Sequence, residues 1–353
     1  MPLCTAFKLP GGFPALCFVS TSAPVCACGL GGGLHAPEER AGRDGRFVPM
    51  QADRGAGKRR RVLFSGKFRA VSVPIFAYFV VTLQRKYTSL ILDMKIKDVV
   101  VTLERFAPLP LQESYDNAGL QIGLTEAEDV SGVLLCLDVT EEVIEEAVRK
   151  GCNLVVSHHP LLFRPLRHIT GQTQVERCVA MAIRKGVSLY AAHTNLDNAP
   201  GGVNFMIAEK LGLHGVRFLQ PLSDGQGGSG VMGILPKSLA VADFICQVAG
   251  AFGVEALMHN DFKDRDISRV ALCGGAGDFL LDESIRQGAD AFLTGEMGYH
   301  RYFGHEHDLL IGVLGHYQSE QYTVELLHRI LEKAHPGLHI EETCIRTNPI
   351  RVN

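Results

Sequence analysis

The chain has 353 residues, of which 46% are hydrophobic, and its formal net charge is −3. A chain of this length can bury a large hydrophobic core, and one to three domains fit within it. The charge is uneven, because residues 1–93 hold 13 Lys and Arg against five Asp and Glu, whereas residues 94–353 hold 22 against 33. The acidic body argues against nucleic-acid phosphate as the main partner.

The first 93 residues differ in composition from the rest. They are rich in Gly, Pro, Cys and Arg and show no clear periodicity. Their apolar run at residues 70–83 is shorter than the roughly 20 residues of a bilayer span and lies too far along the chain for a signal peptide, so we expect no membrane partner. Because a helical pattern follows Met94 at once, we expect residues 1–93 to be a disordered leader or sequence upstream of a native start at Met94. N-terminal sequencing of the native protein tests this.

Cysteine usage points to a reducing compartment. Ten cysteines are present without any Cys-x-x-Cys spacing, and the six after residue 94 lie mostly within apolar runs. Such thiols are typical of a protein core and argue against a disulfide framework. We therefore expect a cytoplasmic protein.

From residue 94 onward, helical and strand patterns alternate. Apolar spacing at Val99, Val100, Leu103 and Phe106 predicts a first helix, which Pro108 and Pro110 end. Strands are expected at 132–137, 153–157, 188–192, 231–235, 268–273, 289–294 and 309–314, and helices at 141–149, 176–185, 203–211, 241–252, 279–286 and 322–331. This alternation predicts an α/β fold with buried strands.

The glycine-rich stretch at residues 224–230 is the best linker candidate. It divides the body, residues 94–353, into a first half at 94–222 and a second half at 231–353. The extension at 1–93 completes the predicted domain organisation.

Similar residues recur in the two halves at a constant spacing of 137 residues, and this repeated pattern is the internal echo. The matched pairs are Val133 and Val270, Leu135 and Leu272, Cys136 and Cys273, and Gly151 and Gly288. In this register, the pair His158-His159 is matched by Gly295-Glu296. The echo predicts two similar α/β halves, an internal repeat, that face each other across a cleft.

Histidines and acids follow several of the buried strands directly. His158 and His159 follow the strand at 153–157, while the pairs His193/Asp197 and His316/Glu320 each have a spacing of four residues. Residues at i and i+4 share one helix face, which suits chelation, and ligands favour the carboxyl ends of strands in α/β sheets. Local hydrogen bonding of loop histidines and a capped helix start are the structural alternatives. The combination favours metal binding.

The ligand types narrow the choice of metal. Imidazoles and carboxylates without thiolate suit two divalent ions of Zn, Fe, Mn, Co or Ni, whereas Ca and Mg prefer more oxygens. Two ions about 3.5–4 Å apart, bridged by a carboxylate, activate a shared water, and this is hydrolytic chemistry.

Two further residues are candidates for proton transfer. Glu296 stands in the echo where His159 stands, and it could act as a general base or as an acid that supports a ligand. An exposed loop glutamate is the alternative. His300 lies in the same loop. The glycine-rich turn at 274–277 lacks GxGxxG and the P-loop Lys-Ser/Thr, so we expect a tight turn there rather than a phosphate cradle.

Five motifs of the body form a recognisable set. They are Asp116-Asn117-Ala118-Gly119-Leu120-Gln121, Ser157-His158-His159-Pro160-Leu161-Leu162-Phe163, His193-Thr194-Asn195-Leu196-Asp197, Thr294-Gly295-Glu296 and Gly315-His316-Tyr317-Gln318-Ser319-Glu320. Together they resemble the NIF-three-like family, whose members carry the name GTP cyclohydrolase 1 type 2 homolog. The resemblance covers essentially all of residues 94–353 and leaves residues 1–93 outside.

The resemblance implies a dinuclear metal cleft between two similar halves, often assembled as a toroidal homohexamer. The implied ligands are His158, His159, Asp197, His316 and Glu320, with Glu320 as the bridge between the ions. The family name implies opening of the GTP imidazole ring, yet the sequence contains no NKxD-type base-reading motif and no P-loop.

Two functions of different class follow. The first is a metal-dependent hydrolase that acts on a small, nucleotide-like substrate, with Glu296 or His300 assisting proton transfer. The second is a non-enzymatic metal-binding assembly, either regulatory or a metal chaperone, in which the ions hold the halves together. A nucleic-acid-associated factor is disfavoured by the acidic body.

Overall fold

The computed structural model describes residues 94–123, 128–223, 225–262 and 265–351. By its contacts the chain separates into Met1–Ala70 and Val71–Asn353, and the described residues all belong to the second unit. The expectations for the segment before Met94 lie outside the described residues.

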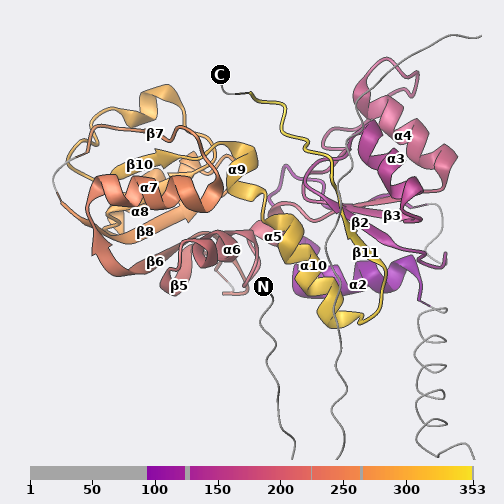
Figure 1. The fold of residues 1–353 in the computed structure, drawn as a ribbon, viewed down its shortest axis with the longest axis horizontal. Coiled ribbons are helices and arrows are strands. Elements are labelled where there is room, and N and C mark those ends of the chain that lie inside the picture. Colours follow the sequence, from indigo (N-terminus) through magenta and orange to yellow (C-terminus); the bar gives the residue numbers. More distant parts are fainter. Residues whose placement is uncertain (1–93, 124–127, 224, 263–264, 352–353) are drawn as a thin grey trace, which may run out of the picture. The chain divides into compact units, whose positions relative to one another are not determined.

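The first sheet contains five strands within the described ranges, and they are largely parallel (Figure 1). They are β1 (Gly119–Ile122), β2 (Val133–Cys136), β3 (Leu154–Ser157), β4 (Ser188–Ala191) and β11 (Ile340–Glu342). Their order is β1-β4-β3-β2-β11, and only β1 runs antiparallel to its neighbour. The carboxyl ends of β2, β3 and β4 therefore lie at one edge.

The second sheet has six described strands and is mixed. They are β5 (His214–Pro221), β6 (Gly228–Leu239), β7 (Met258–His259), β8 (Ile267–Cys273), β9 (Ala291–Thr294) and β10 (Leu310–Val313). The order is β5-β6-β8-β9-β10-β7, in which β8, β9 and β10 are parallel. The chain thus forms an α/β fold with two mixed sheets.

Sheet membership departs from the predicted organisation in two places. The predicted linker residues lie in the turn and at the start of β6, since β5 and β6 pair as an antiparallel hairpin. The predicted segments 94–222 and 231–353 do not coincide with the sheets, since β5 lies in the second sheet and β11 returns to the first. Among the described strands, the first sheet has four that are parallel and the second has three, and the two sheets also differ in strand number and order.

The helices lie between and beside the strands. The longer ones are α2 (Ile96–Phe106), α3 (Glu141–Arg149), α4 (Gln174–Lys185), α6 (Val203–Lys210), α7 (Val241–Phe252), α8 (Leu281–Arg286) and α10 (Thr323–Ala334). Short turns of helix are α5 (Thr194–Asp197), α9 (His316–Glu320), η1 (Leu109–Leu111), η2 (Asp278–Leu280) and η3 (Tyr299–Tyr302). The helices α3 and α7 have the bounds that the periodicity predicts.

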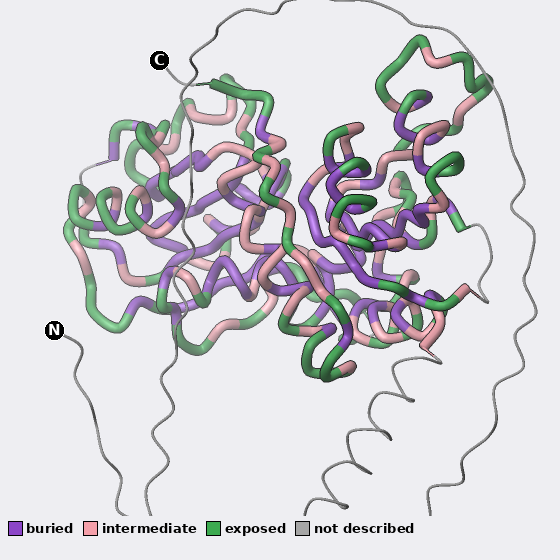
Figure 2. The backbone as a smooth tube through the Cα atoms, turned by 45° about the vertical axis from the view of Figure 1, so that its right-hand side comes forward, coloured by how far each residue is buried: buried purple, intermediate pink, exposed green. Residues whose placement is uncertain are grey.

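Alternating side chains of the strands enter different hydrophobic clusters. Val133 and Leu135 of β2 join the largest cluster, whereas Leu134 and Cys136 of the same strand pack against α3 and α4. This alternation is the normal consequence of the strand repeat. The largest cluster also contains residues of β8, β9, α2, α6 and α10, so one core joins both sheets. Figure 2 shows the buried stretches of backbone (purple) in the interior.

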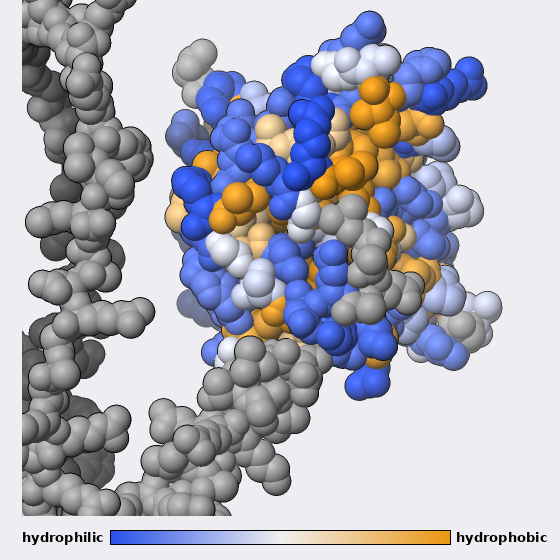
Figure 3. Space-filling model, turned by 90° about the vertical axis from the view of Figure 1, so that its right-hand side faces the viewer, coloured by the Kyte–Doolittle hydropathy of each residue, from blue (hydrophilic) through white to orange (hydrophobic). Residues whose placement is uncertain are grey.

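The surface is mainly polar where helices face solvent. On the side of the molecule where α3 and α4 lie, hydrophilic residues predominate, with hydrophobic patches between them (Figure 3). Among the described helices, none has both the length and the apolar character that a membrane crossing requires.

The start of α3 offers a test of local stability. The Thr140 hydroxyl accepts a hydrogen bond from the Val143 N–H at 3.3 Å and so caps the helix. We expect Thr140→Ala to lower the free energy of unfolding by about 1 kcal/mol, because a cap donor loses its partner. Urea unfolding measures this, and Thr140→Ser, which keeps the hydroxyl, should stay near the parent protein. An equal loss in both variants would contradict the capping role.

Candidate metal centre

Polar side chains gather where parallel strands of both sheets end. His158 and His159 directly follow β3, and His193 stands two residues beyond the end of β4. From the second sheet, His316 and Glu320 occupy the first and last positions of α9, which follows β10. Because the carboxyl ends of parallel strands lie at the same edge of a sheet, the potential ligands that follow the strands of one sheet lie together at that edge.

Three potential metal-donor atoms form a nearly equilateral triangle. The His159 Nε2 lies 3.0 Å from the Glu320 Oε2, the His316 Nε2 lies 3.1 Å from the same oxygen, and the two nitrogens are 3.1 Å apart. Ligands at roughly 2.0–2.1 Å from a tetrahedral ion lie about 3.3 Å from one another. These three residues therefore form one of the groups that could hold a metal ion.

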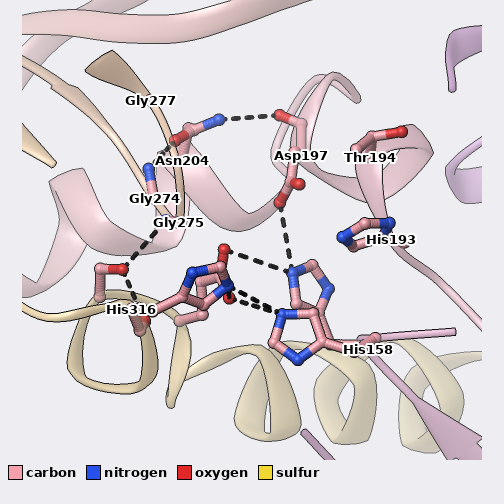
Figure 4. A network of polar contacts seen from close by, with 12 residues as sticks. His158, His193, Thr194, Asp197, Asn204, Gly274, Gly275, Gly277 and His316 are labelled. Atoms are coloured by element: carbon pink, nitrogen blue, oxygen red, sulfur yellow. Dashed lines mark hydrogen bonds and ion pairs between the residues drawn. The ribbon is translucent and has the colours of Figure 1, made fainter. Parts of the chain in front are cut away.

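A second group lies against the other oxygen of the same carboxylate. The His158 Nε2 is 3.7 Å from the Glu320 Oε1 and 3.7 Å from the Asp197 Oδ1 (Figure 4). His158 is fully buried, and neither its Nε2 nor the Asp197 Oδ1 has a hydrogen-bond partner among the described residues. Two buried polar atoms that face each other without a bond fit a site for a cation, because such atoms are otherwise rare.

The Nδ1 atom of each of these four histidines, on the other side of the ring from Nε2, has a hydrogen-bond partner. The Nδ1 atoms contact the Ala192 carbonyl (His158, 2.8 Å), Asp138 (His159, 2.7 Å), Asp116 (His193, 2.7 Å) and Glu296 (His316, 2.7 Å). When Nδ1 donates to these oxygens, Nε2 keeps its lone pair for a metal. Carboxylate and carbonyl partners of this kind are typical of metal-binding histidines.

The structure adds residues that the predicted ligand set leaves out. His193 forms a second potential metal group with His158 and His159, although it stood outside the predicted ligand set. The sequence feature that could have added His193 to the ligand set was its position after a buried strand. Asp138 also follows a buried strand, β2, and the same signal could have found it. Asp116 had no signal beyond its place in a motif.

The charges of the cluster depend strongly on one another. Burial alone would raise the pKa of Glu320, but the neighbouring histidines hold it well below its usual value. Burial would likewise lower the pKa of His159, yet hydrogen bonds to Asp138 and Glu320 raise it to about 10, while the bond to Glu320 raises the pKa of His316 to about 9. Burial raises the pKa of Asp197 to about 7. Without metal, protons on His159 and His316 balance the Glu320 charge, and a bound cation would replace them.

A glycine turn lies directly against Glu320. Gly275 has a φ of +59°, and a Cβ at this position would lie 2.3 Å from the Glu320 Oε1. The Gly275 N–H donates to the Ser319 hydroxyl at 3.0 Å. The turn is a tight one, as expected, and the absence of a side chain at Gly275 makes room for the carboxylate.

We expect Gly275→Ala to weaken metal binding about tenfold or more, because the new methyl group must displace the Glu320 carboxylate. Isothermal titration with Zn²⁺ measures this. Gly253→Ala is the matched control, since Gly253 has a φ of +61° with nothing within 4 Å of its Cβ position. It carries the same backbone strain and should bind Zn²⁺ like the parent protein. Equal affinity in both variants would show that the turn does not position Glu320.

The two candidates for proton transfer lie in different surroundings. The Glu296 carboxylate holds the His316 Nδ1 and is 58% exposed. His300 is exposed on η3, and its ring contacts among the described residues are Tyr299 and Phe303. The structure brings Glu296 to the cluster and leaves His300 away from it.

Two cavities flank the cluster. One of about 400 Å³ is lined by Asp138, His159, His193, Glu296 and His316, together with Leu137, Pro160, Phe163, Tyr317, Asn348, Pro349 and Ile350. The other, of about 210 Å³, reaches Asp197 and Glu320 and is bordered by Glu113, Tyr115, Asn198, Asn204 and the glycine turn. A larger cavity of about 650 Å³ among α2, α6 and α10 contains none of the cluster residues. Space for a small molecule therefore exists beside the potential ligands.

Comparison with known proteins finds similar sequences and similar folds. The family model described as Duf34/NIF3 (NGG1p interacting factor 3) matches residues 94–349. A GTP cyclohydrolase 1 type 2 homolog of Clostridium perfringens is 35% identical over 229 residues, which cover 64% of this chain and 87% of that protein. NIF3-like protein 1 of Drosophila melanogaster is 30% identical over 256 residues, with 71% and 85% covered. The crystal structure of Staphylococcus aureus protein SA1388 shares 26% identity and a TM-score of 0.69, covering 74% of this chain and 100% of its own.

Proposed function

Because the chain belongs to the Duf34/NIF3 family, we propose that it binds two divalent metal ions and acts as a metal-dependent hydrolase on a small, nucleotide-like substrate. The observation that carries this proposal is the position of Glu320. One oxygen of its buried carboxylate faces His158, and the other faces His159 and His316. A carboxylate with ligands on both sides is the bridge that a dinuclear centre requires.

The proposed ligands divide into two sets that share Glu320. His158 and Asp197 complete one set, and His159 and His316 complete the other. The absence of thiolate from both sets favours Zn, Fe, Mn, Co or Ni. His193, whose Nδ1 is held by Asp116, lies beside His158 and His159 but belongs to neither set, so its Nε2 is left to face a substrate.

When bound, such ions lower the pKa of water and polarise an oxygen of the substrate. The chain contributes the remaining parts of the reaction. Glu296 orients His316 through its Nδ1, and Asp138 does the same for His159. His193 borders both cavities, and with Nδ1 bonded to Asp116 its Nε2 can accept a proton from a substrate held there. Phe163, on the same two cavities, offers an aromatic wall for a planar substrate.

The experiment that tests this is a metabolite screen on protein loaded with Fe, Mn or Zn. We expect hydrolysis of at least one small metabolite and its loss in His158→Ala. His328→Ala is the matched control, because His328 lies on α10 and bonds to Glu342. Two tightly bound ions with no turnover of any metabolite would reject the hydrolase.

A second candidate, the non-enzymatic metal-binding assembly, is favoured by the origin of the ligands. His158 and His159 follow a strand of the first sheet, whereas His316 and Glu320 follow a strand of the second. Ions at this place would hold the two sheets together. This candidate predicts that metal removal changes assembly or partner binding, without turnover of any metabolite.

We propose two further features of the architecture. The echoed segments lie in parallel strands, with Val133–Cys136 in β2 and Val270–Cys273 at the end of β8, which supports an internal repeat of two halves that face each other across the metal cleft. The resemblance supports a homohexamer, which sedimentation equilibrium tests. A monomer in solution at micromolar concentration would reject it.

A further inference from the structure

The C-terminal segment after β11, residues 343–351, runs along the metal centre. It leaves the first sheet beside β2 and continues toward α9 (Figure 1). At its start, the Thr343 hydroxyl and the Cys344 N–H both donate to Glu146, an almost fully buried residue of α3. This end is therefore anchored to the first sheet and its helix.

The middle of the segment reaches the side of the site that comes from the second sheet. The Arg346 guanidinium lies 5.9 Å from the centroid of the Tyr317 ring, and Tyr317 directly follows the potential ligand His316. Asn348 is buried, and its carbonyl and side chain bond to Arg351 and Ile350. The segment thus contacts elements on both sides of the cluster.

Thr347 connects this segment to a metal ligand. Its hydroxyl donates to the Asp138 Oδ2 at 2.5 Å, while the other oxygen of Asp138 accepts from the His159 Nδ1 at 2.7 Å. Asp138 stands at the end of β2 with its side chain 35% exposed, so packing alone does not fix the carboxylate. The terminal torsion of an aspartate is broad, and two bonds in opposite directions restrict it.

We propose that Thr347 is a positioning residue of the metal centre, which acts through Asp138 to orient His159, and that Asn348, Pro349 and Ile350 form a wall of the substrate cavity. This inference rests on the proposed metal-binding function. Its support is the unbroken path Thr347–Asp138–His159 and the place of residues 348–350 on the 400 Å³ cavity that contains His159 and His316. The last strand of the fold thereby delivers part of the site.

The test measures Zn²⁺ affinity by competition with a chromophoric chelator and records the absorption spectrum of the Co²⁺-loaded protein. Thr347→Val keeps the shape of the side chain and removes the hydroxyl, and we expect affinity to fall about tenfold, as for other outer partners of metal ligands. The Co²⁺ spectrum should change, because the His159 ring loses its fixed direction. Thr347→Ser, which keeps the hydroxyl, should restore both.

A double-mutant cycle isolates the route through Asp138. Asp138→Asn should weaken Zn²⁺ binding, and adding Thr347→Val to this variant should cause no further loss if Thr347 acts only through Asp138. Additive losses would overturn the proposed route.

Thr343→Val is the matched control within the same segment, because its hydroxyl bonds to Glu146 and not to Asp138. It should lower thermal stability and leave Zn²⁺ affinity unchanged. If Thr343→Val and Thr347→Val weaken binding equally, order in the segment is responsible and the role of Thr347 is overturned. A parent-like Zn²⁺ affinity in Thr347→Val overturns it as well. A parent protein that binds no Zn²⁺ would instead refute the proposed metal function on which the inference rests.

Discussion

Replacing Glu320 by glutamine is expected to lower Zn²⁺ affinity by more than roughly 100-fold and to remove both ions together. Loss of an outer partner weakens metal sites by about 10–100-fold, and loss of a direct ligand exceeds this range. The glutamine side chain has one oxygen where glutamate has two. It therefore cannot bind one ion beside His158 and a second ion beside His159 and His316. Metal content by mass spectrometry and affinity by chelator competition measure the result.

Glu325→Gln supplies the matched control for this substitution. Glu325 lies on α10 and pairs with Lys210 and Arg329, away from the cluster. It should retain two ions per chain with parent-like affinity. If Glu320→Gln instead keeps one tightly bound ion, the carboxylate is not shared and the bridge is refuted.

Stripping the protein with a chelator is expected to lower the melting temperature by roughly 10 °C. A ligand present at about 1,000 times its Kd stabilises the folded state by about 4 kcal/mol, and 1 kcal/mol corresponds to about 2–4 °C for a chain of 150–250 residues. The effect arises because the proposed ligands come from both sheets and no such site exists in the unfolded chain. Differential scanning calorimetry with and without Zn²⁺ measures it.

Glu320→Gln also serves as the control for chelation. Its melting temperature should be the same in chelator and in Zn²⁺, because its sites no longer hold metal. If the parent protein has the same melting temperature in chelator and in Zn²⁺, the stabilising role of the ions is refuted.

The buried parallel strands could be predicted because each is a continuous apolar run. The residues of β2, β3 and β9 are all buried, and such runs are typical of strands covered on both faces. Among the described strands, the sequence did not predict β1, β5, β7 and β11. They lie at the edges of the sheets, where exposure permits polar side chains and glycine and so removes the apolar signal.

The site was predictable to the extent that its residues follow buried strands. His158, His159, His316 and Glu320 come together in the structure as the sequence predicts, and Asp197 lies beside His158. The supporting contacts were beyond the reach of sequence spacing. Asp138 and Thr347 are separated by 209 residues, and only the pairing of β11 with β2 brings them together.

The return of β11 to the first sheet has a consequence for the order of folding during synthesis. The second sheet uses one unbroken stretch, from β5 to β10, and can assemble as soon as that stretch has left the ribosome. The first sheet begins earlier along the chain, yet its β2 edge stays open until β11 has been made. Ribosome-bound chains that stop before β11 should therefore contain a protease-resistant second sheet and a protease-sensitive first one. The metal centre would then mature only after β11 has been made and has paired with β2.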